Sequence, residues 1–90
     1  MSTRVHLYSN LQRYTGNQLT VEVQGDTVGS CLKDLVRQYP ALKPVLFDKS
    51  GNLQSNIYIS LNLTSSKSEQ IEKPVGAGDE IYLILIVAGG

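Results

Sequence analysis

The sequence has 90 residues, enough for one domain around a single core, and 41% of them are hydrophobic, as is ordinary for a globular protein. Its eight basic and eight acidic residues cancel, so there is no net attraction for nucleic acid or an anionic membrane, and we expect neither as a partner. The single cysteine cannot form an internal disulfide, and no apolar run approaches the roughly 20 residues that span a bilayer. The first residues lack the features of a secretory signal, and we therefore expect a cytoplasmic location.

Two alternating runs near the N-terminus predict an antiparallel hairpin. Residues 3–9 and 18–24 each alternate between apolar and polar side chains, which is the pattern of a half-buried strand. The segment between them contains the turn sequence Thr15-Gly16-Asn17. The first strand directs three side chains away from the expected core: Arg4, His6 and Tyr8.

After the hairpin the apolar residues recur at helical spacing. Thr27 is a good N-cap, and Asp26 beside it suits the positive end of the helix dipole. Pro40 ends the helix at or just before Tyr39. We expect this amphipathic helix to cover the sheet with an apolar stripe that comprises Val28, Cys31, Leu32, Leu35, Val36 and Tyr39.

The second half of the chain predicts an edge hairpin, a strand and a loop. Residues 41–55 give a weak signal, but Val45-Leu46-Phe47 and Leu53 flank a turn-rich stretch, which suggests a short edge hairpin packed under the helix. Residues 56–63 alternate clearly and predict a strand, and the polar, Ser-rich residues 64–73 predict a surface loop. The outer face of that strand carries Tyr58, Ser60 and Asn62.

The last strand is apolar on both faces. Residues 81–87 are seven consecutive apolar or aromatic residues, rich in β-branched types. A sheet with this strand parallel to the first strand at its centre explains the pattern, and the residues of its outer face then belong to the core. Alternatively, these residues are partly exposed and form an apolar docking surface that leads to the C-terminal tail. The outer set comprises Tyr82, Ile84 and Ile86, if the alternate set faces the helix.

The strand continues through Ala88 into Gly89 and Gly90. Because glycine has no Cβ, this segment can adopt almost any backbone conformation and enter a slot too narrow for other residues. Chance or a trimmed end is the alternative explanation of the two glycines.

These features together resemble the MoaD/ThiS family of ubiquitin-like sulfur carriers, from Val5 to Gly90. Three motifs carry the resemblance in this order: Asp26-Thr27-Val28, Gly78-Asp79-Glu80-Ile81 and Ala88-Gly89-Gly90. Further segments resemble the longer members of the family, which include the CysO-type carriers of cysteine synthesis: Pro40-Ala41-Leu42, Leu46-Phe47-Asp48 with Gly51, and Leu61-Asn62. Residues 62–66 depart from the family, which often has a glycine or an acidic residue after the asparagine. This departure bears on the branch of the family that the chain resembles and does not involve the C-terminal Ala-Gly-Gly motif.

The resemblance implies an α+β fold of the β-grasp (ubiquitin-like) type, with a mixed sheet of four to five strands packed on one main helix. Residues 1–87 would form this domain, and residues 88–90 would form a flexible Ala-Gly-Gly tail.

The resemblance also implies a mechanism. An activating enzyme would use ATP to adenylate the carboxylate of Gly90, and a sulfur donor would convert it to a thiocarboxylate that a sulfur-accepting biosynthetic enzyme consumes. Ala88, Gly89 and Gly90 would thread the channel of a partner, and a metalloprotease would trim the C-terminus where Gly90 is not the encoded end. The carrier itself would bind no cofactor. The product could be cysteine, methionine, molybdopterin, thiazole or a thioacid.

The other reactive residues have simpler interpretations. Cys31 lies on the apolar stripe of the helix with no activating group beside it, so we expect a core residue. His6 is expected to be an exposed strand residue, and one His with one Cys cannot form a zinc site. Asp79 and Glu80 are expected at the turn and the strand start, with contact to a basic partner as the alternative. Solvated positions are expected for Arg4, Lys33 and Arg37. We therefore expect no catalytic or metal site, and no enzyme.

Three other functions remain open. A ubiquitin-like protein modifier would share the adenylation step but end in an isopeptide bond from Gly90 to a lysine. A non-conjugating β-grasp interaction module would use only its surface, and deletion of Gly89 and Gly90 would not affect it. An RNA-binding β-grasp domain is disfavoured by the zero net charge.

Overall fold

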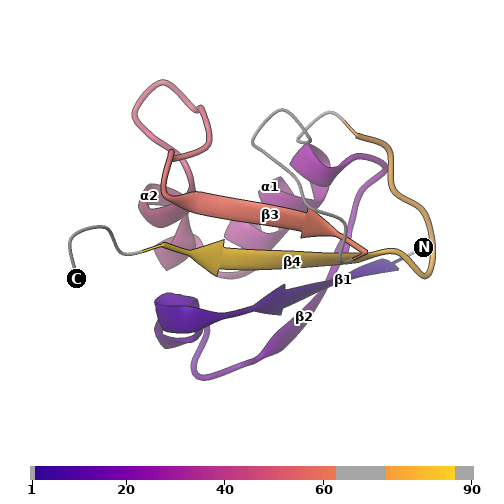
Figure 1. Cartoon of the computed structure of the whole chain (residues 1–90), viewed down its shortest axis with the longest axis horizontal. Helices are drawn as coiled ribbons and strands as arrows, with labels where there is room; N and C mark the ends of the chain where they lie inside the picture. Colours follow the sequence, from indigo (N-terminus) through magenta and orange to yellow (C-terminus); the bar gives the residue numbers. More distant parts are fainter. Residues whose placement is uncertain (1, 63–72, 87–90) are drawn as a thin grey trace.

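The computed structural model describes residues 2–62 and 73–86, which form a four-stranded sheet with helices on one side (Figure 1). The strands are β1 (Ser2–Leu7), β2 (Thr20–Gln24), β3 (Ile57–Leu61) and β4 (Glu80–Leu85). The main helix is α1 (Val28–Gln38), and the shorter helical segments are η1 (Ser9–Tyr14), η2 (Pro40–Leu42) and α2 (Lys43–Leu46). The expected α+β arrangement is confirmed.

The strand order is β2-β1-β4-β3, with β1 and β4 parallel at the centre. β2 and β3 each pair antiparallel to their neighbours, which confirms the N-terminal hairpin and the central position of the last strand. The register places His6 beside Tyr82 and places Tyr58 beside Ile84. Because side chains alternate along each strand, these residues share the face of the sheet that is turned away from α1.

The core lies between the sheet and α1. Alternate residues of all four strands enter it, together with the stripe of the helix that the sequence predicted. Leu11 of η1 is also fully buried, although the sequence placed it in a loop. The largest fully buried side chains include Leu7, Leu32, Leu35, Leu42, Leu46, Ile59, Ile81 and Leu83.

The start of α1 is fixed by a reciprocal pair of hydrogen bonds. Ser30 N donates to Thr27 Oγ1 at 3.1 Å, and Thr27 N donates to Ser30 Oγ at 3.0 Å. This capping box satisfies backbone donors that have no partner within the helix. The helix ends at Gln38, directly before Tyr39 and Pro40, as expected.

The predicted edge hairpin over residues 41–55 is only partly correct. Val45 and Leu46 lie in α2 and not in a strand. The helical segments begin where Pro40 and Pro44 occupy first-turn positions, which proline favours because its fixed φ suits a helix start. The hairpin is reduced to one antiparallel bridge between Phe47 and Leu53.

The surface loop expected at residues 64–73 lies outside the described residues except for Lys73, which is exposed. Among the helices of the described ranges, none has the length and apolar character needed to cross a membrane.

Candidate functional site

The outer face of the sheet is open, because the helices pack on its other side (Figure 1). We call this surface the open face; it is formed by the outward residues of β1, β4 and β3. Tyr82 and Ile84 are half-buried there, whereas Ile86, just after β4, is 46% exposed. The interpretation of these three residues as core residues is therefore wrong. They fit the alternative interpretation, a partly exposed apolar surface, because no second layer covers this side of the sheet in the described part of the chain.

An aromatic row crosses the open face. The rings of His6 and Tyr82 stack with centroids 4.4 Å apart and planes 9° apart, and Tyr8 stacks on the same tyrosine at 6.1 Å. His6 Nε2 is hydrogen-bonded to Glu80 Oε1. His6 thus lies on the predicted face but is not freely exposed: only 21% of its side chain is accessible, because Tyr82 covers it. Desolvation, and after it the neighbouring Glu80 carboxylate, raise the pKa of the Tyr82 phenol.

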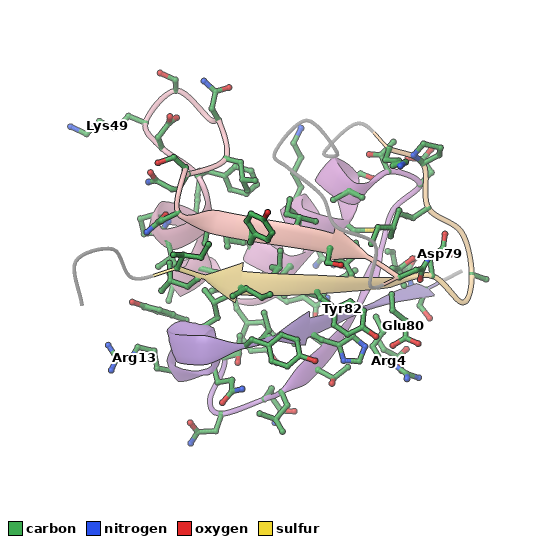
Figure 2. All side chains as sticks on the ribbon, viewed as in Figure 1. Arg4, Arg13, Lys49, Asp79, Glu80 and Tyr82 are labelled. Carbon is green, nitrogen blue, oxygen red and sulfur yellow. The ribbon has the colours of Figure 1, made fainter. Side chains whose placement is uncertain are left out.

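The end of the open face where β4 begins is polar. Arg4 lies in register with Glu80, and Figure 2 shows both close to Tyr82 at the front of the sheet. Asp79 holds the preceding turn: its Oδ2 accepts from Gly76 N at 2.9 Å, and its Oδ1 accepts from Asn62 Nδ2 at 3.1 Å. These bonds lower the pKa of the Asp79 carboxyl. The expected turn and strand-start roles of Asp79 and Glu80 are confirmed.

The opposite end of the open face is apolar and includes Ile86, the last described residue. Ile86 N donates to Asn56 O at 2.8 Å, which holds the last described residue at the end of β4. Val87 and the predicted tail, Ala88, Gly89 and Gly90, lie outside the described residues. Their roles remain predictions.

The buried thiol of Cys31 confirms its predicted place in the core. The Cys31 side chain is fully buried, and this desolvation raises the pKa of its thiol. The raised pKa disfavours the thiolate, which is the reactive form of cysteine. The predicted solvated positions of Arg4, Lys33 and Arg37 are also confirmed, with Arg37 paired to Asp34.

Two residues of the open face were not included in the predicted docking surface. Tyr8 and Tyr58 are 45% and 43% exposed and lie close to the predicted residues of β4. Strand alternation placed both side chains outward, but only the pairing of strands far apart in sequence brings them beside Tyr82 and Ile84.

The sheet order, the main helix α1 packed on one side and the open face on the other are those of a ubiquitin-like β-grasp protein. The sequence matches the ThiS family over residues 5–90, and the chain belongs to that family.

Two named relatives cover nearly the whole chain. Small archaeal modifier protein 1 of Haloferax volcanii is 34% identical in an alignment 86 positions long that covers 93% of this chain and 95% of the relative. Sulfur carrier protein CysO of Mycobacterium tuberculosis is 30% identical in an alignment 93 positions long, gaps included, that covers both chains in full.

The solved structures agree with the sequence comparison. The crystal structure of the Haloferax volcanii protein superposes with a TM-score of 0.87, 32% identity and full coverage of both chains. CysO in the Amycolatopsis orientalis BexX/CysO complex superposes with a TM-score of 0.81 and 25% identity, over 98% of this chain and 99% of that one. One relative is thus named as a carrier and another as a modifier, and a carrier has been crystallised with a partner protein.

Proposed function

We propose that this chain is a sulfur carrier whose Gly90 carboxylate is converted to a thiocarboxylate, either as the encoded end or after removal of a following segment. An activating enzyme would join the carboxylate to the α-phosphate of ATP, which releases pyrophosphate and gives an acyl-adenylate. Sulfur from a donor would then attack the acyl carbon, and AMP would leave. The thiocarboxylate would pass its sulfur to an accepting biosynthetic enzyme.

The observation that carries this proposal is the family match, which extends from residue 5 through both terminal glycines. The 30% identity with a sulfur carrier over the full chain supports it.

The open face supplies what a carrier must provide to its activating enzyme. The chemistry needs ATP and a sulfur donor on the enzyme, and the carrier contributes a carboxylate without neighbouring side chains and a rigid surface that positions it. Tyr82, Ile84 and Ile86 form an apolar surface that reaches the last described residue before the predicted tail in the sequence, and Tyr58 and Tyr8 extend it. Aromatic and aliphatic anchors of this kind dominate the energy of protein interfaces. We therefore place the docking of the activating enzyme on the open face, with Ala88, Gly89 and Gly90 threaded into its channel.

Protein modification is the second candidate, and the 34% identity with a small archaeal modifier protein favours it. It would use the same adenylation and then join Gly90 to a target lysine. Immunoblots of extracts from the source cells distinguish the two: a modifier gives a ladder of heavier adducts that disappears when Gly90 is deleted, whereas a carrier gives one free band.

Substitution of Gly90 tests the use of its carboxylate. Gly90→Val should abolish formation of the acyl-adenylate, because a branched side chain beside the carbonyl must fit at the point of attack, while circular dichroism stays unchanged. Gly76→Val is the matched control, since a Cβ at this glycine meets no atom within 4 Å. ATP–pyrophosphate exchange with the activating enzyme measures both. Normal exchange by the Gly90 variant would refute the proposal.

A further inference from the structure

A second surface, distinct from the open face, lies beside the helices. We call it the basic cleft: a hollow of about 580 Å³ between α1, α2 and the turn after α2. Its floor includes Val36 and Phe47, which are half-buried and pack against the core. The cations that line it are Lys33, Arg37, Lys43 and Lys49.

The charge of the basic cleft is unusual for a neutral chain. It gathers four of the eight basic residues of the sequence, all of them exposed. The one carboxylate that lines it, Asp48, holds the turn: its Oδ1 accepts from Ser50 N at 2.9 Å and from Asn52 N at 3.0 Å, and the four cations of the lining outnumber its single negative charge. Arg37 pairs with Asp34, whereas within residues 2–62 and 73–86 no carboxylate pairs with the three lysines.

The form of the basic cleft favours a protein segment over a small anion. Small phosphate sites usually converge backbone N–H groups or a helix N-terminus on one point. Here the charges are carried on flexible side chains around an apolar floor. In a bound segment that combines carboxylates with an aromatic or aliphatic residue, the carboxylates would pair with the cations and the apolar residue would pack on the floor of the cleft.

We propose that the basic cleft binds an acidic protein segment that carries an apolar anchor residue. The cleft is formed by α1, α2 and the following turn, whereas the open face is formed by strands; Figure 2 shows Lys49 far from Tyr82 and Glu80. The two surfaces are therefore formed by different residues, and we assign them to different partners. This inference does not depend on whether Gly90 carries sulfur.

The test is an NMR titration of the 15N-labelled chain at low salt with a synthetic peptide of six glutamates around one central phenylalanine. We expect the amide signals of Val36, Phe47 and the 48–51 turn to shift, and the binding to weaken as salt is added. The same peptide with a central serine should bind more weakly, because it cannot fill the apolar floor.

Two double variants with reversed charges test whether the lysines of the basic cleft bind the peptide. The pair K43E and K49E should weaken peptide binding by about tenfold or more, since two attractions become repulsions. The pair R13E and K73E is the matched control, because it changes the net charge by the same amount at exposed residues outside the cleft, and it should bind almost as the parent does.

Four results would overturn the proposal. These are no binding at low salt, shifts confined to the open face, equal loss of binding in the two double variants, and shifts of the cleft amides with inorganic phosphate or anionic vesicles but not with the peptide. A fifth result, self-association that the pair K43E and K49E abolishes, would also overturn the proposal and assign the cleft to a second copy of the chain. All of these measurements use the free chain without ATP or sulfide, so their failure leaves the proposed carrier function unaffected.

Discussion

Gly25 lies where the chain leaves β2 and turns into α1, and the reason for glycine there is space. A Cβ at this position would lie 2.7 Å from Cys31 N and 2.9 Å from the carbonyl carbon of Ser30, closer than real contacts allow. Both neighbours are backbone atoms of the first helical turn and cannot move without shifting the helix. The close approach of β2 to α1 therefore depends on this glycine.

Gly25→Ala should lower the free energy of unfolding by about 1–3 kcal/mol, the usual cost of overpacking. Urea denaturation measures the loss. Gly76→Ala is the matched control, because it adds the same methyl group in open space. Equal stability of the two variants would show that the start of α1 is not tightly packed against β2.

Asp34 ties the helix to the sheet through one carboxylate. Its Oδ1 accepts from Arg37, and its Oδ2 accepts from Gln24 N and Gln38 Nε2, each at 3.0 Å. The bonds from Arg37 and from the Gln24 backbone lower the pKa of the Asp34 carboxyl. A carboxyl whose pKa is lower in the folded state stabilises the fold above its unfolded pKa, and this stability is lost as the pH falls through the folded pKa.

The unfolding free energy should therefore fall as the pH is lowered from about 5 towards 3. Asp34→Asn should be less stable than the parent at neutral pH and should lose less on acidification, because the amide does not titrate. Urea denaturation across this pH range measures both. Parallel curves for the two proteins would contradict the role assigned to Asp34; Asp79, whose pKa is also lowered, accounts for the slope that remains in the variant.

At the scale of elements, β4 has two different faces although its sequence is apolar throughout. Ile81 and Leu83 are fully buried, whereas Ile86, just beyond the strand, is 46% exposed. Because an exposed apolar residue contributes little to folding, its surface is available for binding.

Ile86→Asp should leave the unfolding free energy within about 0.5 kcal/mol of the parent but raise the KM for activation by the partner enzyme about tenfold. Leu19→Asp is the matched control: this leucine is 60% exposed, just before β2 and outside the open face, and its replacement should leave KM unchanged. An unchanged KM for the Ile86 variant, or an equal increase in both, would remove the docking role from this end of the open face.

The elements differ in how far the sequence predicts them. The alternation of β1, β2 and β3 and the helical stripe that starts at Val28 are local patterns, and the structure confirms them. The two short helical segments at residues 40–46 were missed because one or two turns are too short for a clear helical period, and Leu42 and Leu46 also fit a strand.

The site depends more on non-local pairing. Nothing in the local sequence shows that Tyr82 covers His6 or that Tyr8 joins the same row, because these contacts follow from the parallel pairing of β1 with β4. The exposure of the outer residues of β4 likewise depends on how many layers cover the sheet. The sequence periodicity therefore identified which residues form the outer face of β4, but not whether that face is covered or exposed.

At the scale of the whole molecule, the two surfaces suit a protein that serves more than one partner. The open face has an aromatic and apolar part that reaches Ile86 and a polar end where β4 begins, while the basic cleft is cationic and lies beside the helices. Within the described residues, the thiol of Cys31 is buried, and His6 is stacked on Tyr82 and hydrogen-bonded to Glu80. In the carrier function that we propose, the chemistry would take place at the terminal carboxylate, and the partners would supply the catalytic groups.

The most direct test of this account is the intact mass of the protein before and after incubation with ATP, sulfide and its activating enzyme. We predict a mass gain equal to the replacement of one oxygen by sulfur, and fragmentation should place it on Gly90. No gain, with an enzyme that demonstrably forms the acyl-adenylate of this chain, would contradict the carrier function and leave the modifier as the better account.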